Sequence, residues 1–126
     1  MVKSVELAMI AARKAQESGY CGIATVVEHR KIVDGNHLTN YQDVVVLENQ
    51  ACKLSYESIK QSTQGESAVE VTQAIKLFIS PDVAIKPGSK ITVTQSGVTE
   101  DYTCSGVPAV YPTHQEIILD LFERWA

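Results

Sequence analysis

Cys104, His114 and Glu116 come nearest, among the residues of this chain, to a catalytic set. A cysteine thiol beside a histidine that a carboxylate orients could act as the nucleophile of an acyl transfer. If residues 114–116 form a strand, the side chains of His114 and Glu116 share one face of it. Three common residue types in one stretch do not by themselves indicate an enzyme. We expect His114 to be a turn residue at the point where the chain re-enters a sheet.

Motifs for other chemistry do not occur in the sequence. It contains no glycine-rich phosphate loop, no Gly-x-Ser-x-Gly and no His-Glu-x-x-His. Its cysteines are odd in number and widely spaced, which argues against a disulfide framework and against a zinc site. We expect Cys21, Cys52 and Cys104 to be buried thiols that pack as small apolar groups. The prediction is a protein that is not an enzyme and has no cofactor and no metal.

Length and charge restrict the class of protein further. A chain of 126 residues fits one domain over residues 1–126, and it is long enough to bury a core without a metal or a disulfide. No apolar run approaches the roughly 20 residues of a membrane span. The N-terminal segment is a poor secretory signal because Glu6, Arg13 and Lys14 interrupt it. We therefore expect no membrane partner and synthesis in the cytoplasm.

Acidic residues gather at the C-terminal end of the chain. Residues 98–126 contain five acidic side chains and a single basic one, Arg124, and the whole chain has a formal net charge of −4. Tight nucleic-acid binding generally needs a basic patch that neutralises several phosphates. The sequence shows no such run of basic residues, which fits a surface that DNA slides past and equally a protein that never meets DNA.

Residues 4–18 are predicted to form an N-terminal α-helix. Val5, Ala8, Met9 and Ala12 follow the i, i+3, i+4, i+7 spacing of one helix face. Because most of these side chains are small, the helix would pack closely on a sheet or on a neighbouring subunit. Met9 is therefore a candidate subunit or partner contact.

The periodicity changes to that of strands over about residues 22–122. β-Branched residues and alternation mark several strands between turns, the first turn at Asp34-Gly35. The apolar run over residues 44–47 indicates either a strand covered on both faces or a bulge. The expected fold is mainly β, a small antiparallel β-barrel or sandwich of about six strands with the N-terminal α-helix packed on it.

Residues 113–126 fit two patterns. Thr113-x-x-Glu116 is a capping box, which indicates a helix, whereas the alternation over residues 117–122 indicates a strand. We favour the strand, because a last strand that closes a barrel removes an exposed edge. Phe122 and Trp125 are candidate partner contacts as exposed anchors, or they fold back onto the barrel, and both interpretations stay open.

A polar stretch over residues 57–67, ESIKQSTQGES, is predicted to be a flexible loop between two strands. Loops of this length in compact domains are often functional, although a tolerated surface insertion is the alternative. The candidate residues of this loop are Ser58, Lys60, Gln61, Ser62, Thr63, Gln64, Gly65 and Glu66.

Two segments together resemble a known family. They are PDVAIKPGSKITV over residues 81–93 and, after a turn, the stretch from Tyr102 to the YPTHQE motif that ends at Glu116. This pattern is similar to the C-terminal half of the head-closure (head-tail connector, minor capsid or stopper) proteins of long-tailed bacteriophages. It covers about a third of the chain.

The resemblance implies a structural virion protein, a homo-oligomeric ring at the phage neck. Such a ring lies between a portal or adaptor protein and a tail-completion or tail-tube protein, closes the DNA-filled head and docks the tail. Double-stranded DNA passes through its channel without tight binding. In related rings a flexible loop projects into the channel and helps to retain DNA, and residues 57–67 occupy a corresponding place.

Two alternatives remain from the sequence. One is a tail-completion or head-tail adaptor ring, which differs only in its neighbours. The other is an OB-fold or SH3-like binding module, which would need aromatic and basic residues on one sheet face. Tyrosines are present, but no cluster of lysines or arginines accompanies them.

Overall fold

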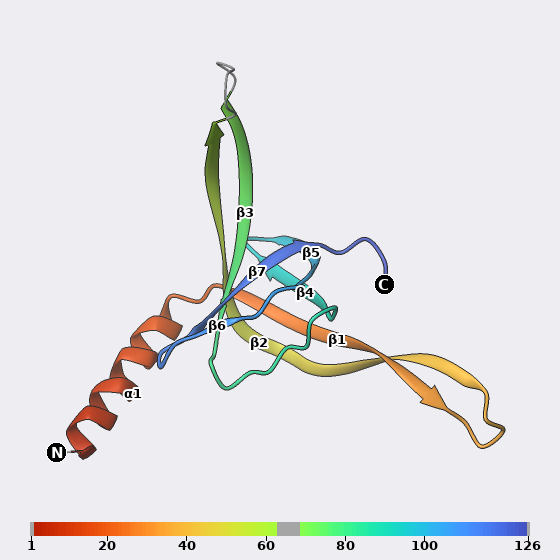
Figure 1. The fold of residues 1–126 in the computed structure, drawn as a ribbon. Coiled ribbons are helices and arrows are strands. Elements are labelled where there is room, and N and C mark those ends of the chain that lie inside the picture. The colour runs from red at the N-terminus through yellow and green to blue at the C-terminus, as the bar shows by residue number, and fades with distance from the viewer. Residues whose placement is uncertain (1, 63–68, 126) are drawn as a thin grey trace.

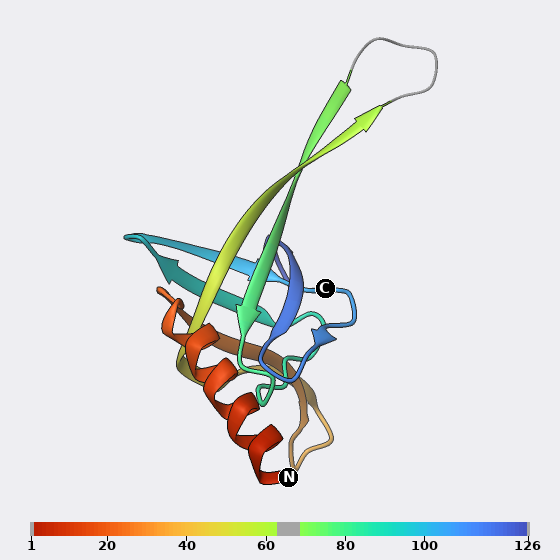
Figure 2. The ribbon, with the colours of Figure 1, turned by 90° about the vertical axis from the view of Figure 1, so that its left-hand side faces the viewer.

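A computed structural model describes residues 2–62 and 69–125 of the chain, as one helix and seven strands (Figures 1 and 2). The elements are α1 (Val2–Ser18), β1 (Gly22–Val33), β2 (Thr39–Ser62), β3 (Val69–Ile79), β4 (Lys90–Gln95), β5 (Val98–Thr103), β6 (Ala109–Val110) and β7 (Gln115–Leu121). The predicted mainly β fold with an N-terminal helix is confirmed. Within this described part, no helix is long and apolar enough to cross a membrane.

All seven described strands belong to one antiparallel sheet whose pairings close on themselves. The strand order is β3-β2-β1-β4-β5-β7-β6, and β7 also pairs with β3 over Ile75–Ile79. The strand interpretation of the C-terminal region is therefore confirmed over Gln115–Leu121. Because β7 joins β3 to β5, it covers strand edges that would otherwise be free, which was the reason for preferring a strand.

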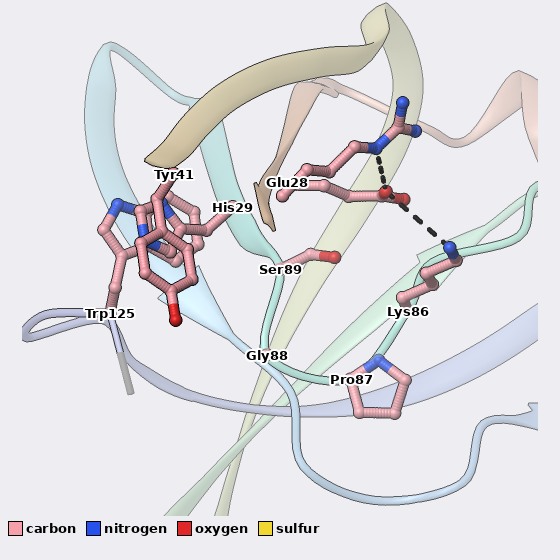
Figure 3. A pocket seen from close by; sticks show the side chains of 9 residues that line it. Glu28, His29, Tyr41, Lys86, Pro87, Gly88, Ser89 and Trp125 are labelled. Carbon is pink, nitrogen blue, oxygen red and sulfur yellow. Dashed lines mark hydrogen bonds and ion pairs between the residues drawn. The ribbon is translucent and has the colours of Figure 1, made fainter. Parts of the chain in front are cut away.

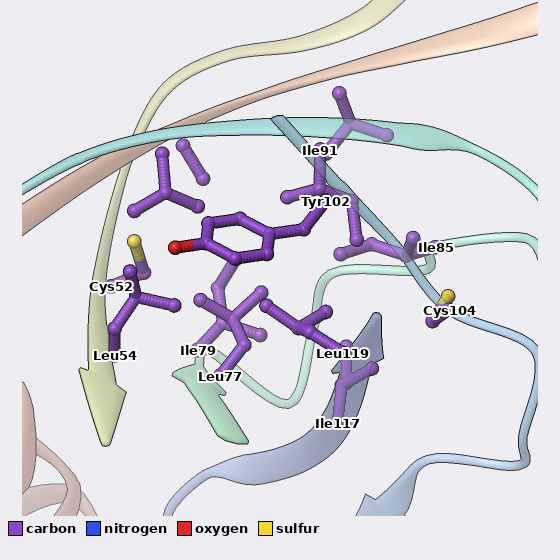
Figure 4. Packing of buried hydrophobic residues seen from close by; sticks show 13 residues of the cluster. Cys52, Leu54, Leu77, Ile79, Ile85, Ile91, Tyr102, Cys104, Ile117 and Leu119 are labelled. Carbon is purple, nitrogen blue, oxygen red and sulfur yellow. The ribbon is translucent and has the colours of Figure 1, made fainter. Parts of the chain in front are cut away.

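The core lies inside this closed set of strands (Figure 4). Most of its side chains come from alternate positions of the strands, because successive side chains of a strand point to opposite faces, and Ile85 and Cys104 come from links between strands. The core side chains are Ala24, Val26, Cys52, Leu54, Leu77, Ile79, Ile85, Ile91, Val93, Tyr102, Cys104, Ile117 and Leu119. The prediction of three buried cysteines is wrong for Cys21, which is exposed in the link between α1 and β1.

Strand β2 pairs with two strands, with β1 along its first half and with β3 along its second half. The register with β1 shifts on both sides of Val26, which places extra residues in β2. Asn49 lies in the first of these bulges, at a positive φ of 52° that asparagine tolerates better than most residues. The bulge interpretation of the apolar run over residues 44–47 is therefore confirmed.

Two two-stranded arms leave the core (Figure 1). In the β1–β2 arm, residues 28–33 pair with residues 39–44, beyond the last pairing of β1 with β4 at Val27. In the β2–β3 arm, residues 57–62 pair with residues 69–74, before β3 meets β7 at Ile75. Six residues of strand span about 20 Å, so both arms extend well beyond the body.

The predicted flexible loop over residues 57–67 is wrong for residues 57–62, which belong to β2. The polar composition indicated a loop because a buried strand needs apolar side chains. A two-stranded arm outside the core has no such requirement, so polar residues can form it. Residues 63–67 lie outside the described residues.

Helix α1 begins at Val2 and ends at Ser18, close to its predicted bounds, but it does not pack on the sheet as expected. Its side chains over residues 3–12 are all exposed. Its C-terminal turns are held by polar contacts instead. Arg13 donates hydrogen bonds to Ser80 Oγ at 2.6 Å and to Asp82 Oδ2 at 2.7 Å. Packing on a neighbouring subunit, the other expectation for this helix, stays a prediction.

Candidate functional site

Three stacked rings lie at the base of the β1–β2 arm (Figure 3). The ring of His29 lies between those of Tyr41 and Trp125, with centroids 4.8 Å apart on both sides and interplanar angles of 5° and 12°. His29 and Tyr41 come from the two strands of the arm, whereas Trp125 follows β7. The stack therefore ties the C-terminal segment to the arm where the arm leaves the body.

Further contacts extend this stack toward the body. Phe122 meets Trp125 edge-on with centroids 4.9 Å apart, and Lys90 Nζ lies 5.4 Å from the centroid of the Phe122 ring. His29 Nδ1 lies 2.8 Å from Asp43 Oδ1 on the facing strand. Of the two interpretations of Phe122 and Trp125, the structure therefore has the one in which they fold back. A partner contact at these residues stays a prediction.

A hollow of about 320 Å³ opens beside the stack. Its polar wall consists of Glu28, Arg30 and residues 86–89 (Figure 3). The Glu28 carboxylate accepts a hydrogen bond from Arg30 Nε at 2.9 Å and lies 3.9 Å from Lys86 Nζ. Because one carboxylate lies between two cations, these three groups keep a net charge of +1. No three His, Cys, Asp or Glu side chains of the described residues gather to hold a metal ion.

Replacing His29 with alanine should expose Trp125, which is the single tryptophan of the chain. Each aromatic pair contributes about 0.5–1.5 kcal/mol beyond its buried area, so the variant should lose about 1–3 kcal/mol of unfolding free energy. The tryptophan emission should shift to longer wavelength and become more sensitive to acrylamide. His37→Ala, in the turn of the same arm, is the matched control. Unchanged emission in His29→Ala would show that the stack does not form in solution.

The three residues first considered for catalysis have different surroundings. His114 Nε2 lies 3.2 Å from Glu116 Oε2, on one face as predicted, and the His114 ring stacks on Tyr111 with centroids 4.8 Å apart. Cys104 lies in the core, with its Sγ 4.0 Å from the carbonyl oxygen of Lys86. Burial raises the pKa of the Cys104 thiol, although a backbone hydrogen bond from Gly88 opposes the shift. A cysteine nucleophile needs the opposite shift, so this geometry does not support the nucleophile hypothesis.

Burial raises the pKa of the Cys52 thiol to about 12, with a smaller contribution from Cys21. The thiol is thus easier to ionise in the unfolded chain, where its pKa is near 9. The stabilisation is complete below about pH 9 and is lost as the pH rises toward 12. We expect the unfolding free energy to fall by up to about 1.4 kcal/mol per pH unit in this range.

Denaturant titrations of the wild type and of Cys52→Ala between pH 8 and 11 would measure this effect. The variant should show a shallower slope, although not a flat one, because the pKa values of Tyr102 and Cys104 are raised in the same direction. Equal slopes in both proteins would contradict the assignment to Cys52.

Gln115 is a functional position that sequence reasoning missed. Its side-chain amide is buried and donates hydrogen bonds to the carbonyl oxygens of Ser80, at 2.7 Å, and Val83. Ser80 also accepts the hydrogen bond from Arg13. A polar path thus leads from β7 through Gln115 and Ser80 to α1. The available signal was that Gln115 is in phase with the inward-facing Ile117 and Leu119.

The sequence-predicted contact residues do not form one site. Met9 is exposed on α1, whereas Phe122 and Trp125 belong to the aromatic stack. Residues 58–62 of the candidate loop lie in the β2–β3 arm, which leaves the body in another direction from α1 (Figure 1). The remaining loop candidates, residues 63–66, lie outside the described residues.

Comparisons with known proteins identify no family. No family model matches the chain, and no curated protein matches it. One solved structure, the phage-like element PBSX protein xkdH from Bacillus subtilis, aligns with 81% of this chain and 92% of its own. The two are 12% identical with a TM-score of 0.45. An alignment at that identity and TM-score shows neither a family nor a function for this chain.

Proposed function

We propose that this chain is a structural subunit of a bacteriophage virion. Copies of it would form a ring at the neck that closes the DNA-filled head and docks the tail. The resemblance over residues 81–93 and 102–116 supports this role. Residues 81–93 form the segment before β4 and all of β4 except its end. Residues 102–116 run from the end of β5 through β6 into β7. They therefore include parts of four strands of the closed sheet.

The observation that carries the proposal is the exposed apolar surface on elements that project from the body. Leu7 and Ile10 on α1 are 65% and 63% exposed, and Val33 and Leu38 are exposed at the end of the β1–β2 arm. Scattered exposed apolar residues are normal on a monomer, but groups of them on projecting elements mark interaction surfaces. Assembly with other subunits would cover them.

The β2–β3 arm is the element that we propose to face the DNA channel. The resemblance gives residues 57–67 a place in the sequence that corresponds to the projecting loop of related rings, and residues 57–62 form part of the first strand of this arm. The net charge of −4 would let double-stranded DNA slide past the ring without tight binding. The ring would contact the portal or an adaptor on one side and the tail-completion or tail-tube protein on the other.

The test is to mix the purified protein with DNA-filled, tailless capsids and to image the portal vertex by electron microscopy. Ring-shaped density at the vertex, together with slower DNA leakage, is the expected result. A variant that lacks the β2–β3 arm should still bind the vertex but retain DNA less well. Binding to tail ends alone would instead favour a tail-completion protein. Binding to neither particle would overturn the virion role.

A further inference from the structure

We propose that α1 docks on the C-terminal end of β7 in a second copy of this chain, so that successive copies join head to tail. The inference rests on the proposed function, because it names the surfaces through which ring subunits would meet. It does not depend on which viral proteins lie above and below the ring.

The first surface is a helix stripe formed by Lys3, Leu7, Ile10 and Lys14, on the side of α1 opposite to the face predicted from residues 5, 8, 9 and 12. Their spacing places them along one side of α1, and all of them are exposed. A surface helix usually turns its apolar side to its own core. Here the body holds α1 by Arg13, whose pKa is raised by the hydrogen bonds to Asp82 and then Glu17. The two large apolar side chains of the stripe are consequently left for another molecule.

The second surface is a C-terminal patch formed by Ile118, Asp120 and Glu123. Ile118 and Asp120 share the outward face of β7, Ile118 is 54% exposed, and both carboxylates are exposed. The patch belongs to the stretch 98–126, in which five acidic side chains accompany one basic side chain. Like the helix stripe, the patch combines large apolar surface with two charged residues.

Charge complementarity selects a second copy as the occupant. The helix stripe carries two lysines and the C-terminal patch two carboxylates, so the two surfaces are opposite in charge and both have apolar surface. Within the described residues, these four charged groups form no ion pair. Each surface therefore keeps its charge available for a partner.

The two surfaces lie on opposite flanks of the body, α1 on one and the C-terminal end on the other (Figure 1). They cannot meet within one chain, and a contact between two different surfaces repeats from copy to copy. Such heterologous contacts close into rings or continue as filaments. A helix of 17 residues is about 25 Å long, so one side of it buries less than the roughly 800 Å² per partner of a standard interface. We therefore expect weak association in solution and stable association on a template such as the portal vertex.

Charge reversal tests the contact directly. The variants are Lys3→Glu with Lys14→Glu, Asp120→Lys with Glu123→Lys, and all four changes together. Self-association is measured by sedimentation velocity up to millimolar protein at low salt, and ring density is measured on capsid vertices. Each double reversal should raise the concentration for half-association at least about tenfold, and the quadruple variant should return to within about threefold of the wild type. Lys31→Glu with Lys53→Glu makes the same charge change at exposed positions that belong to neither surface and should have no effect.

The outcomes separate this contact from the neck role. Double reversals without effect, a quadruple variant that fails to recover, or the absence of self-association in both assays would overturn the contact. If all variants form vertex rings equally well, the contact is wrong and the neck role stands. If the variants behave as expected in solution but the wild type ignores the vertex, the contact stands and the neck role fails. Circular dichroism of each variant verifies that it is folded.

Discussion

Replacing Gln115 with leucine should lower the free energy of unfolding by about 2–4 kcal/mol. Leucine keeps most of the buried volume but removes the amide that donates to the carbonyl oxygens of Ser80 and Val83. A buried acceptor left without its partner costs about 1–3 kcal/mol. Two carbonyls lose the same donor, and the one of Val83 is less buried. Urea denaturation followed by circular dichroism measures the change.

The same substitution should loosen the attachment of α1. The Ser80 hydroxyl accepts a hydrogen bond from Arg13, and the Ser80 carbonyl oxygen accepts one from the Gln115 amide. The attachment of α1 therefore depends on a segment that Gln115 positions. Amide hydrogen exchange should accelerate over residues 80–85 and in the link between α1 and β1. Gln42→Leu, at an exposed position of β2, is the control and should change stability little. If Gln115→Leu proved as stable as that control, the buried amide would not be what positions the segment.

Much of the sheet could be predicted because local periodicity and burial agree there. The alternation of Ile117 and Leu119 marked β7 as a strand, and those side chains are in the core. The apolar run over residues 44–47 indicated either a strand covered on both faces or a bulge, because consecutive side chains of a regular strand point to opposite faces, and the structure has the bulge. In both places the cause lies within a few positions of the residue itself, so the sequence pattern contains it.

The features that could not be predicted depend on contacts between distant residues. The aromatic stack brings His29 next to Trp125, and the attachment of α1 brings Arg13 next to Ser80. In both pairs the two residues lie far apart in the sequence. Residues 57–62 form a strand because they pair with residues 69–74 outside the core, where polar side chains are allowed. Periodicity finds a strand by alternating apolar side chains, and the polar sequence of residues 57–62 does not show that pattern.

The packing of helix α1 is another feature that the sequence pattern could not determine. The face with Val5, Ala8, Met9 and Ala12 predicted a helix that packs, and the helix is present, but this face is exposed like the opposite one. What the sequence could not show is whether the apolar side faces this chain or another, because both arrangements require the same spacing. In a single chain the hydrogen bonds of Arg13 to Ser80 and Asp82 attach α1 to the body and leave its apolar residues exposed. A single chain therefore leaves the apolar surface of α1 uncovered.

A pair of leucine substitutions should separate these two roles of apolar residues. Leu77 is fully buried in the core, and Leu77→Ala should cost about 2–5 kcal/mol of unfolding free energy, from lost burial and from the cavity left behind. Leu7→Ala removes the same atoms from an exposed helix position and should cost less than about 0.5 kcal/mol. Denaturant titrations at low protein concentration, where copies do not associate, give both values.

The comparison matters because the same two variants should rank in the opposite order in assembly. Leu7→Ala should fold like the wild type yet weaken self-association, since its side chain belongs to the helix stripe. If Leu7→Ala destabilised the isolated chain as much as Leu77→Ala does, α1 would pack on its own body in solution. The apolar side of the helix would then be part of the core, and the surfaces proposed for assembly would have to be sought on the two arms instead.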